Sequence, residues 1–244
     1  MVFFTGDLHG TVENIAAFAK KAHPGMEDVI VLLGDVGANY YGGRRDKLMK
    51  RYLNDVGTVF LCIHGNHEMR PTSVPGYVET EWCGGKVWVQ PEYPNLLFAK
   101  DGEIYTMNGL RYLAIGGAYS VDKYYRLSKG WGWWADEQPS DEIKAYVERQ
   151  IREKDIDIVL SHTCPFKYRP IEMFLKVVDQ NTVDNSTERW LDTIEEAIDY
   201  KAWFCGHWHT DKRIDRMHFL FHSYESDEQF KNDILRGEEN CTVS

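Results

Sequence analysis

The stretch Thr5-Gly6-Asp7-Leu8-His9-Gly10 decides the architecture that we predict for this chain. It follows Val2-Phe3-Phe4, an apolar run typical of a buried strand at the start of a domain. Side chains at positions i and i+2 of an extended segment point the same way, so Asp7 and His9 can converge on one cation where the strand ends. An isolated Asp-x-His is more often a solvated loop with a capping aspartate. The metal interpretation therefore depends on partners elsewhere in the chain.

Four further apolar runs also end in side chains that can bind a metal ion. The runs and the side chains after them are 29–33 with Asp35, 58–63 with Asn66 and His67, 156–160 with His162, and 202–205 with His207 and His209. A single histidine before a turn is more often structural than a ligand. Because the carboxyl ends of parallel strands meet at one edge of a sheet, five such coincidences instead indicate a shared metal site. Strands alternating with helical segments predict a layered α/β fold with this site at the strands' C-terminal edge.

The remaining elements follow from hydrophobic periodicity and turn residues. Helices are predicted over 12–21, 45–53, 140–153 and 187–200, and late strands over 213–216 and 219–223. Short strand-like runs cover 86–89, 96–99, 103–107 and 110–115, and Asn108-Gly109 predicts a hairpin between the last two. These four runs predict the start of a second, more antiparallel sheet. Residues 119–134, rich in tyrosine and tryptophan but interrupted by glycine, are predicted to form an ordered loop.

Length and charge bound the class of protein. The 244 residues fit one large domain or two small ones, and 43% hydrophobic residues suffice for a substantial core. We predict one domain over residues 1–226, followed by a polar tail over residues 227–244. The net charge of −10 disfavours a broad electrostatic grip on duplex DNA but leaves room for a local basic pocket.

The cysteines and the apolar segments bear on the compartment. The five cysteines are odd in number and include no Cys-x-x-Cys pair, a usage that suits a reducing compartment. No charged and apolar leader precedes the first strand, and no apolar run approaches the roughly 20 residues that span a bilayer. We therefore expect a cytoplasmic protein with no membrane partner. Its oligomeric state is not determined by the sequence.

The ligand types narrow the choice of metal. The seven candidate ligands are Asp7, His9, Asp35, Asn66, His162, His207 and His209. Carboxylate, amide and imidazole groups without a thiolate suit divalent Mn, Fe, Zn or Co, and argue against a structural zinc site built from cysteine. Seven ligands exceed the needs of one ion, whereas two ions about 3.5–4 Å apart with a shared carboxylate accommodate them. Such pairs act on both the attacking and the leaving oxygen in a displacement at phosphorus.

Taken together, the motifs resemble those of the calcineurin-like metallophosphoesterase family. The matching segments are Gly6-Asp7-Leu8-His9, Gly34-Asp35, Gly65-Asn66-His67-Glu68, His162 and Gly206-His207-Trp208-His209. They occur in the family's order between residues 5 and 210, and their combination is far more specific than any one of them. The resemblance implies a two-sheet β sandwich flanked by helices. It also implies two divalent ions, with Mn²⁺ expected first and Fe, Zn, Co or Ni as alternatives.

The resemblance further implies a role for each matching residue. Asp7, His9 and His209 would hold the first ion, Asn66, His162 and His207 would hold the second, and Asp35 would bridge them. A hydroxide between the ions would be the nucleophile that attacks phosphorus. His67 would lie beside the leaving-group oxygen as a general acid or as a stabiliser of the charged transition state. Glu68 would support the site through a hydrogen bond.

One segment departs from the family pattern. Protein Ser/Thr phosphatases and their relatives extend the second motif to Gly-Asp-x-x-Asp-Arg-Gly, whereas this chain has Ala38 and Asn39 in place of the second Asp and the Arg. A carboxylate partner for His67 and a phosphate-binding arginine are therefore missing from this motif. The departure weakens an assignment as a protein phosphatase. His64 or Glu68 would have to orient His67 instead.

Basic and aromatic residues outside the motifs suggest how a substrate binds. The candidates are Arg44, Arg45, Lys123 and Arg126 for phosphate oxygens, and Trp133 and Trp134 for stacking on a base or an aryl group. Equally, the cations can be solvated surface residues, and the tryptophans can pin their loop to the sheet.

Three hypotheses about function remain open from the sequence. The first is a phosphoesterase for a nucleotide or another small phosphoester, with diesters favoured over phosphoproteins. The second is a nuclease or a nucleic-acid end-processing enzyme, which the acidic balance does not favour. The third is a non-catalytic scaffold, which would have no need of the full ligand set.

Overall fold

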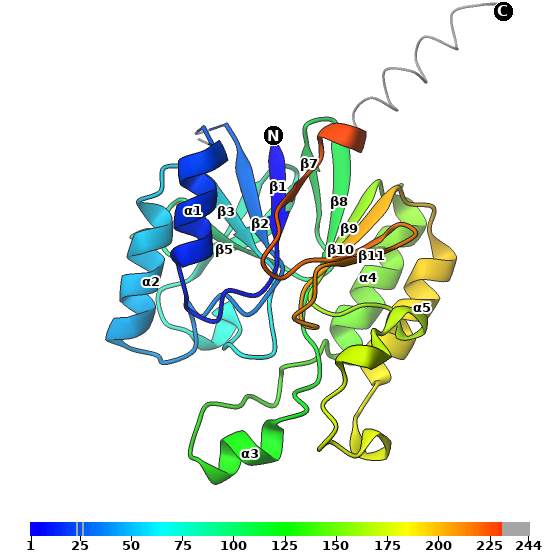
Figure 1. Ribbon diagram of the computed structural model, residues 1–244. Helices are drawn as coiled ribbons and strands as arrows, with labels where there is room; N and C mark the ends of the chain where they lie inside the picture. The colour runs from blue at the N-terminus through cyan, green and yellow to red at the C-terminus, as the bar shows by residue number, and fades with distance from the viewer. Residues whose placement is uncertain (23, 26, 231–244) are drawn as a thin grey trace, which may run out of the picture.

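The structure is a computed structural model that describes residues 1–22, 24–25 and 27–230. Two β-sheets pack face to face, and helices cover the outer face of each (Figure 1). Helices α1 (Glu13–Ala22) and α2 (Arg44–Asn54) lie on one side, and α4 (Asp141–Glu153) and α5 (Ser186–Ala197) lie on the other. This four-layer arrangement confirms the helix-flanked, two-sheet sandwich that the family resemblance implied.

Both sheets place parallel strands in the middle. The order in the first sheet is β13 (Glu225–Ser226), β1 (Val2–Thr5), β2 (Val29–Leu32), β3 (Val59–Cys62), β6 (Leu96–Ala99), β5 (Gly85–Val89) and β4 (Val78–Trp82). The order in the second is β11 (Lys212–Ile214), β12 (Met217–Phe219), β10 (Ala202–Cys205), β9 (Ile158–Ser161), β8 (Leu110–Ile115) and β7 (Ile104–Met107). Strands β1, β2, β3 and β6 are mutually parallel, as are β8, β9, β10 and β12.

Three apolar clusters hold the sandwich together, one between the sheets and one under each pair of helices. Alternation along each strand sends neighbouring side chains to different clusters. In β1, Phe4 stacks on Phe204 of β10 with ring centroids 4.1 Å apart, while Phe3 packs edge-on against Phe18 of α1. In β10, Trp203 points away from Phe204 into the cluster under α4 and α5. Burial on both faces explains why these strands are apolar at every position.

The prediction of where the second sheet begins was wrong. Residues 86–89 and 96–99 belong to the first sheet as β5 and β6, and the second sheet is mostly parallel rather than antiparallel. The choice depends on β6 pairing with β3, a contact that local periodicity does not encode. The hairpin at Asn108-Gly109 is confirmed, with φ of 52° and 78° at the two turn residues.

Five shorter elements also differ from the prediction. Strand β4 was missed because its sequence, VETEW, is an exposed edge strand without a buried apolar run. The segment predicted as a loop contains a short helix, α3 (Lys123–Ser128). The late strands β11 and β12 lie earlier than predicted, over 212–214 and 217–219, and they are followed by β13.

The first residues of the predicted tail pack against the domain. The Asp227 carboxylate accepts hydrogen bonds from the backbone N–H of Val2 and the hydroxyl of Tyr112, and Phe230 is buried between the sheets. Residues 231–244, the rest of that tail, lie outside the described residues, so the tail itself stays a prediction. None of the helices in the described ranges combines the length and the apolar composition needed to cross a bilayer.

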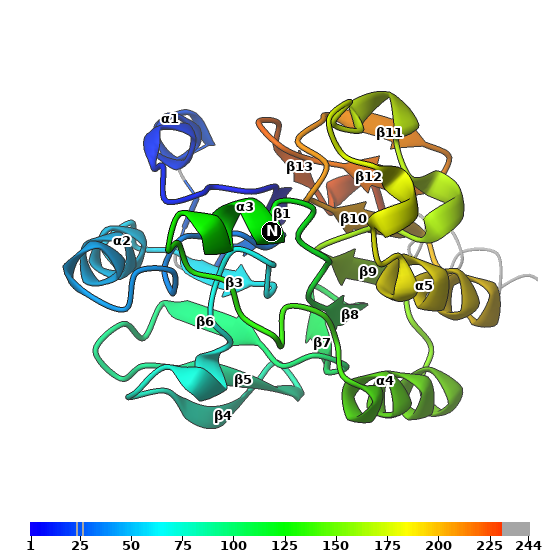
Figure 2. The ribbon, with the colours of Figure 1, turned by 90° about the horizontal axis from the view of Figure 1, so that it is seen from below.

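Two connections project from the end of the sandwich where the parallel strands finish. One contains α3 and runs from β8 to α4; the other runs from β9 to α5 through η2 (Phe166–Tyr168), η3 (Ile171–Met173) and η4 (Gln180–Thr182). Both extend below the sheets in Figure 1, and α3 lies in front of the strands in the view from below (Figure 2). These connections flank the site that the strand ends form.

Candidate metal centre

The ends of β1 and β10 bring three predicted ligands together. Asp7 and His9 follow β1, His209 follows β10, and one ligand atom from each lies within 4.8 Å of the other two. The Nε2 atoms of His9 and His209 are 2.9 Å apart, and His209 Nε2 is 3.5 Å from Asp7 Oδ2. These are the three side chains that the family resemblance assigns to the first ion.

The ends of β3, β9 and β10 form a second group. Asn66 Oδ1 lies 2.8 Å from His162 Nε2 and 3.0 Å from His207 Nδ1. The Asn66 amide nitrogen donates to Ser120 Oγ at 2.9 Å, and His162 Nδ1 lies 2.7 Å from the carbonyl oxygen of Leu33. These outer contacts turn the amide oxygen and His162 Nε2 toward a shared point, as ligation of one ion requires.

Asp35, just past the end of β2, lies between the two groups. Its Oδ1 is 3.6 Å from His162 Nε2, and its Oδ2 is 3.8 Å from His9 Nε2. The backbone N–H of His67 donates to Oδ1 at 2.8 Å and helps to fix the carboxylate. This is the position expected of a bridging ligand. The structure thus brings all seven predicted ligands together, and we call them the ligand cluster: Asp7, His9, Asp35, Asn66, His162, His207 and His209.

Four members of the ligand cluster have backbone conformations that L-residues rarely adopt. The φ angle is 47° at His9, 49° at Asp35, 65° at His207 and 47° at His209. Each such conformation costs on the order of 1–3 kcal/mol and persists only where the surrounding structure imposes it. Backbone strain is therefore concentrated where the ligands leave their strands.

Two glycines of the motifs are required by close packing against the ligands. A Cβ on Gly34, whose φ is +99°, would lie 2.0 Å from His162 Nδ1. A Cβ on Gly65 would lie 2.1 Å from Asp35 Oδ1. These contacts explain why a glycine precedes Asp35 and Asn66: the neighbouring ligand occupies the space that a side chain would take.

The two buried carboxylates of the cluster need a compensating charge. Burial, reinforced by the charge of Asp35, raises the pKa of Asp7 well above its usual value. Burial would also raise the pKa of Asp35, but His162, His67 and His9 together lower it. Asp7 Oδ2 is buried and has no hydrogen-bond partner among the described residues. A cation would satisfy this oxygen and offset the repulsion between the carboxylates, so the residues present fit a metal ion.

The pKa values of three histidines in the cluster are shifted toward the neutral form. Burial lowers the pKa of His162, and it lowers that of His207 well below the usual value. Partial burial, together with the neighbouring His9, lowers the pKa of His209 to about 4. A metal ion binds the neutral imidazole, so these shifts favour ligation. With carboxylate and amide oxygens beside them, the donors suit a divalent ion of intermediate hardness.

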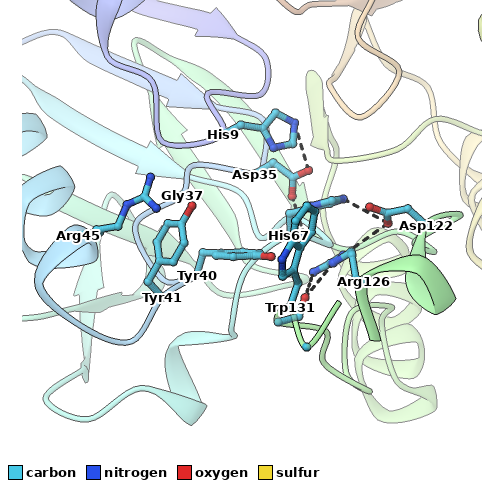
Figure 3. Close-up of a pocket in the computed structure, with 12 residues that line it drawn as sticks. His9, Asp35, Gly37, Tyr40, Tyr41, Arg45, His67, Asp122, Arg126 and Trp131 are labelled. Carbon is cyan, nitrogen blue, oxygen red and sulfur yellow. Dashed lines mark hydrogen bonds and ion pairs between the residues drawn. The ribbon is translucent and has the colours of Figure 1, made fainter. Parts of the chain in front are cut away.

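His67 faces Asp122, a partner that the sequence did not reveal. His67 Nε2 is 3.7 Å from Asp122 Oδ1, and the same oxygen is 3.7 Å from Nη1 of the buried Arg126 (Figure 3). A nitrogen of His67 also lies within 4.8 Å of ligand atoms of His9 and Asp35, so proximity alone would admit it as a ligand. Asp122 lies in a connection where neither periodicity nor a motif marks it.

His64 and Glu68 were predicted to orient His67, but the structure places both in other environments. The Glu68 carboxylate accepts a hydrogen bond from the backbone N–H of Gly65 at 3.1 Å, and burial raises its pKa to about 8. His64 is buried, and its two ring nitrogens have no hydrogen-bond partner among the described residues. Glu68 therefore supports the turn between Gly65 and His67. Asp122 faces His67 in the position that was expected for His64 or Glu68.

Two cavities border the ligand cluster. The first has a volume of about 740 Å³ and is lined by Tyr40, Tyr41, Arg45, Arg126 and Trp131 in addition to His9, Asp35, His67 and Asp122 (Figure 3). The second has a volume of about 370 Å³, and its lining includes those same four residues together with side chains of the β9–α5 connection. Tyr40 and Tyr41 were not predicted as site residues, because they lie in a connection without a pattern. Trp131 belongs to the aromatic segment 119–134 but was not singled out as a substrate contact.

The predicted substrate residues divide into two groups. Arg45 and Arg126 line the first cavity, whereas Arg44, at the start of α2, is exposed and does not. The remaining three predicted residues hold the 119–134 connection in shape instead of lining this cavity. Lys123 Nζ lies 3.8 Å from the centroid of the Trp133 ring, Trp133 Nε1 donates to Glu137 at 2.8 Å, and Trp134 packs edge-on against Tyr40.

Comparisons with known proteins show which family and which solved structures this chain is similar to. A family model described as calcineurin-like phosphoesterase matches residues 1–211. No curated protein matches the chain significantly. The crystal structure of TT1561 of Thermus thermophilus aligns with a TM-score of 0.50 at 13% identity, over 90% of this chain and 87% of that one. The sulfate thiohydrolase SoxB of Thermus thermophilus, in complex with glycerol, aligns with a TM-score of 0.33 at 11% identity, over 88% of this chain and 37% of that one.

Proposed function

This chain belongs to the calcineurin-like phosphoesterase family, and we propose that it uses two divalent metal ions, Mn²⁺ foremost, to hydrolyse a nucleotide or another small phosphoester. The family implies metal-dependent hydrolysis of phosphoesters. One observation carries the rest of the proposal: seven metal-binding side chains from five strand ends converge, and Asp35 lies between two groups of three. Such an arrangement suits two ions better than one.

Each member of the ligand cluster has a role in this proposal. Asp7, His9 and His209 would hold one ion, Asn66, His162 and His207 would hold the other, and Asp35 would serve both. When bound, the ions supply an activated water as the nucleophile and positive charge for the phosphoryl oxygens. The packing that imposes strained backbones on His9, Asp35, His207 and His209 would keep these ligands in place before any ion binds.

His67 acts on the leaving group in this proposal. It lies beside the cluster and lines both cavities, so it can reach a substituent of a phosphorus atom held there. Burial lowers the pKa of His67, and the neighbouring Arg126 lowers it further, whereas the charges of Asp35 and Asp122 oppose this shift. Asp122 therefore favours the protonated imidazole, which can donate its proton to the departing oxygen or stabilise its charge.

A nuclease that acts on single-stranded ends is the second candidate. Tyr41 and Trp131 are 51% and 54% exposed in the lining of the first cavity, and the Arg45 guanidinium lies 4.0 Å from the centroid of the Tyr41 ring. Exposed aromatic rings next to a cation are a common way to bind unpaired bases and a phosphate backbone. The net charge of −10 counts against long duplexes.

The test compares two aryl esters on metal-stripped protein to which Mn²⁺ is returned. We expect faster hydrolysis of bis(4-nitrophenyl) phosphate than of 4-nitrophenyl phosphate, and no turnover of either by Asp35→Asn. A monoester preference would replace the diester proposal with a phosphatase of small phosphometabolites. Cleavage of a labelled single-stranded oligonucleotide in preference to cyclic and linear nucleotides would favour the nuclease. Absence of turnover on every ester would leave a scaffold.

The cytoplasm is the compartment that we propose. Cys62, Cys164 and Cys205 are buried free thiols, and Cys83 is an exposed one. Free thiols of this kind persist in a reducing environment.

A further inference from the structure

The two cavities meet at the ligand cluster. Both are lined by His9, Asp35, His67 and Asp122, so a phosphorus atom held at the cluster has open space on two sides. A phosphomonoester has one substituent and would fill one of these spaces. A phosphodiester has two substituents and can fill both.

The first cavity is aromatic and cationic. Tyr40, Tyr41 and Trp131 provide ring faces and edges, and Arg45 lies over the Tyr41 ring. Arg126 is fully buried, and its Nε donates to the carbonyl oxygen of Gly132 at 2.8 Å, so it supports the wall. These residues suit an aromatic group, with or without a negative charge.

The second cavity has an apolar wall on the β9–α5 connection. Met173, Phe174, Leu175, Val178 and Val183 line it from this connection, and Val121 lines it from the other. The Phe174 ring stacks on Trp208, next to the ligands His207 and His209, with ring centroids 5.7 Å apart. Apolar side chains thus make up one part of the lining, and Arg169, Asp184 and Glu188 add charged groups to it.

Several apolar side chains of this wall are in contact with solvent. Leu175 is 56% exposed, and Met173 and Val121 are each 39% exposed. Clustered exposed apolar groups around a cavity commonly mark the binding site of an apolar ligand. Because the cavity is continuous with the metal centre, that ligand is a part of the substrate.

We propose that the substrate is an asymmetric phosphodiester with an aromatic substituent in the first cavity and an apolar alkyl or aryl substituent in the second. The proposal rests on the proposed function, since it assigns the phosphorus to the ligand cluster. In the reaction, water adds to phosphorus and one P–O bond breaks. The released oxygen takes up the proton that the water loses, and the products are a phosphomonoester and an alcohol or a phenol.

Binding tests the second cavity without turnover. The probes are phenyl(alkyl)phosphinates with methyl, butyl or octyl chains, whose two P–C bonds resist hydrolysis, titrated calorimetrically into the Mn²⁺-loaded protein. The Kd should fall as the chain lengthens, by up to about fourfold for each methylene that enters the cavity. A Kd that does not depend on chain length would overturn the proposal.

Matched variants show whether the dependence of Kd on chain length arises at the wall of the second cavity. Leu175→Glu should abolish most of the dependence on chain length, whereas Val177→Glu should retain it, because Val177 is 93% exposed and does not line the cavity. Met173→Glu is a second variant of the wall. Equal losses in Leu175→Glu and Val177→Glu would show that a general change in charge, and not the cavity, is responsible.

Turnover of alkyl 4-nitrophenyl phosphates separates this inference from the proposed function. We expect kcat/KM to rise with chain length in the same way as binding. Hydrolysis of bis(4-nitrophenyl) phosphate without any chain-length dependence would retain the proposed function and overturn the inference. Chain-length-dependent binding of the phosphinates without turnover of any ester would retain the apolar site and overturn the proposed function.

Discussion

The ligand cluster and the two cavities share a border but are built differently. Members of the cluster follow buried parallel strands, and four of them have strained backbones. The cavity walls come from long connections, on which Trp131 and Leu175 are more than half exposed. Rigid strand ends suit ligands whose geometry must not change, whereas exposed connections vary more freely. We therefore expect substitutions in the cluster to abolish the reaction and substitutions in the walls to change substrate preference.

The largest expected difference lies between two glycines with positive φ. Gly34→Ala would force a Cβ into the His162 ring and should cost more than about 3 kcal/mol of unfolding free energy, with loss of activity. Gly130→Ala in the wall of the first cavity meets nothing within 4 Å and should cost about 1 kcal/mol through backbone strain alone. Chemical denaturation of both variants measures the difference. Equal costs would contradict the contrast between cluster and walls.

The next largest effect concerns His67, at the boundary of the two regions. His67→Ala should lower kcat about 100-fold or more while both metal ions stay bound. Asp122→Asn should lower kcat about 10-fold, since it removes the neighbouring charge but keeps the imidazole. Steady-state kinetics and elemental analysis of each variant supply the two readouts. Loss of metal from His67→Ala would show that His67 is a ligand and that its proposed role is wrong.

A smaller effect is expected from Glu188, a buried residue of α5 that lines the second cavity. Burial raises its pKa to about 7 from the ordinary value of 4.5. The folded state therefore holds this proton more tightly than the unfolded state, and stability falls as pH rises from about 4.5 to about 7. Glu188→Gln removes this pH-dependent loss of stability. It should raise the unfolding free energy by about 2–3 kcal/mol at pH 8, but by much less at pH 4.5.

Thermal melts at the two pH values check this prediction. Glu196→Gln, on the exposed side of the same helix, is the control and should change stability by less than about 0.5 kcal/mol at either pH. A gain from Glu188→Gln that is the same at both pH values would mean that the carboxylate is not destabilised by burial.

The smallest expected effect separates two adjacent arginines. The substrate for this test is the 4-nitrophenyl ester of thymidine 5′-phosphate, with a second phosphate at the 3′ position. Arg45→Ala should raise the KM for this ester about twofold to fivefold and leave kcat unchanged. The effect is small because an exposed charge contact contributes little to binding. Arg44→Ala, which changes a residue outside the cavity, should leave KM unchanged. The same ester without the 3′-phosphate shows whether the charge matters. Identical KM values for the two variants would remove Arg45 from the site.

The sequence reveals the cluster better than the walls for a physical reason. A buried strand must be apolar, and a ligand at its end must be polar, so the change at Asp7 or His207 is visible in the sequence. The neighbouring glycines are required by close packing, as the contact of Gly34 with His162 shows. Asp122 and Tyr41 carry no such signal, because their positions depend on how a connection folds over the sheet edge. The pairing of β6 with β3 escaped prediction for the same reason.

The cavity walls also show what the sequence left open about the tryptophans of residues 119–134. Trp133 and Trp134 were chosen because indole rings stack on bases, yet their rings contact Lys123 and Tyr40 within the protein. Trp131, two residues earlier, lines the cavity instead. Gly130, whose φ is 66°, and Gly132 flank Trp131 and line the same cavity.

Electron paramagnetic resonance of the Mn²⁺-loaded protein tests the central claim most directly. The claim is that the ligand cluster holds two ions bridged by Asp35. It predicts two Mn²⁺ ions per chain with the spectrum of an exchange-coupled pair, and loss of that coupling in Asp35→Asn. A single Mn²⁺ per chain, or two ions whose spectrum shows no coupling in the unmodified protein, would contradict it.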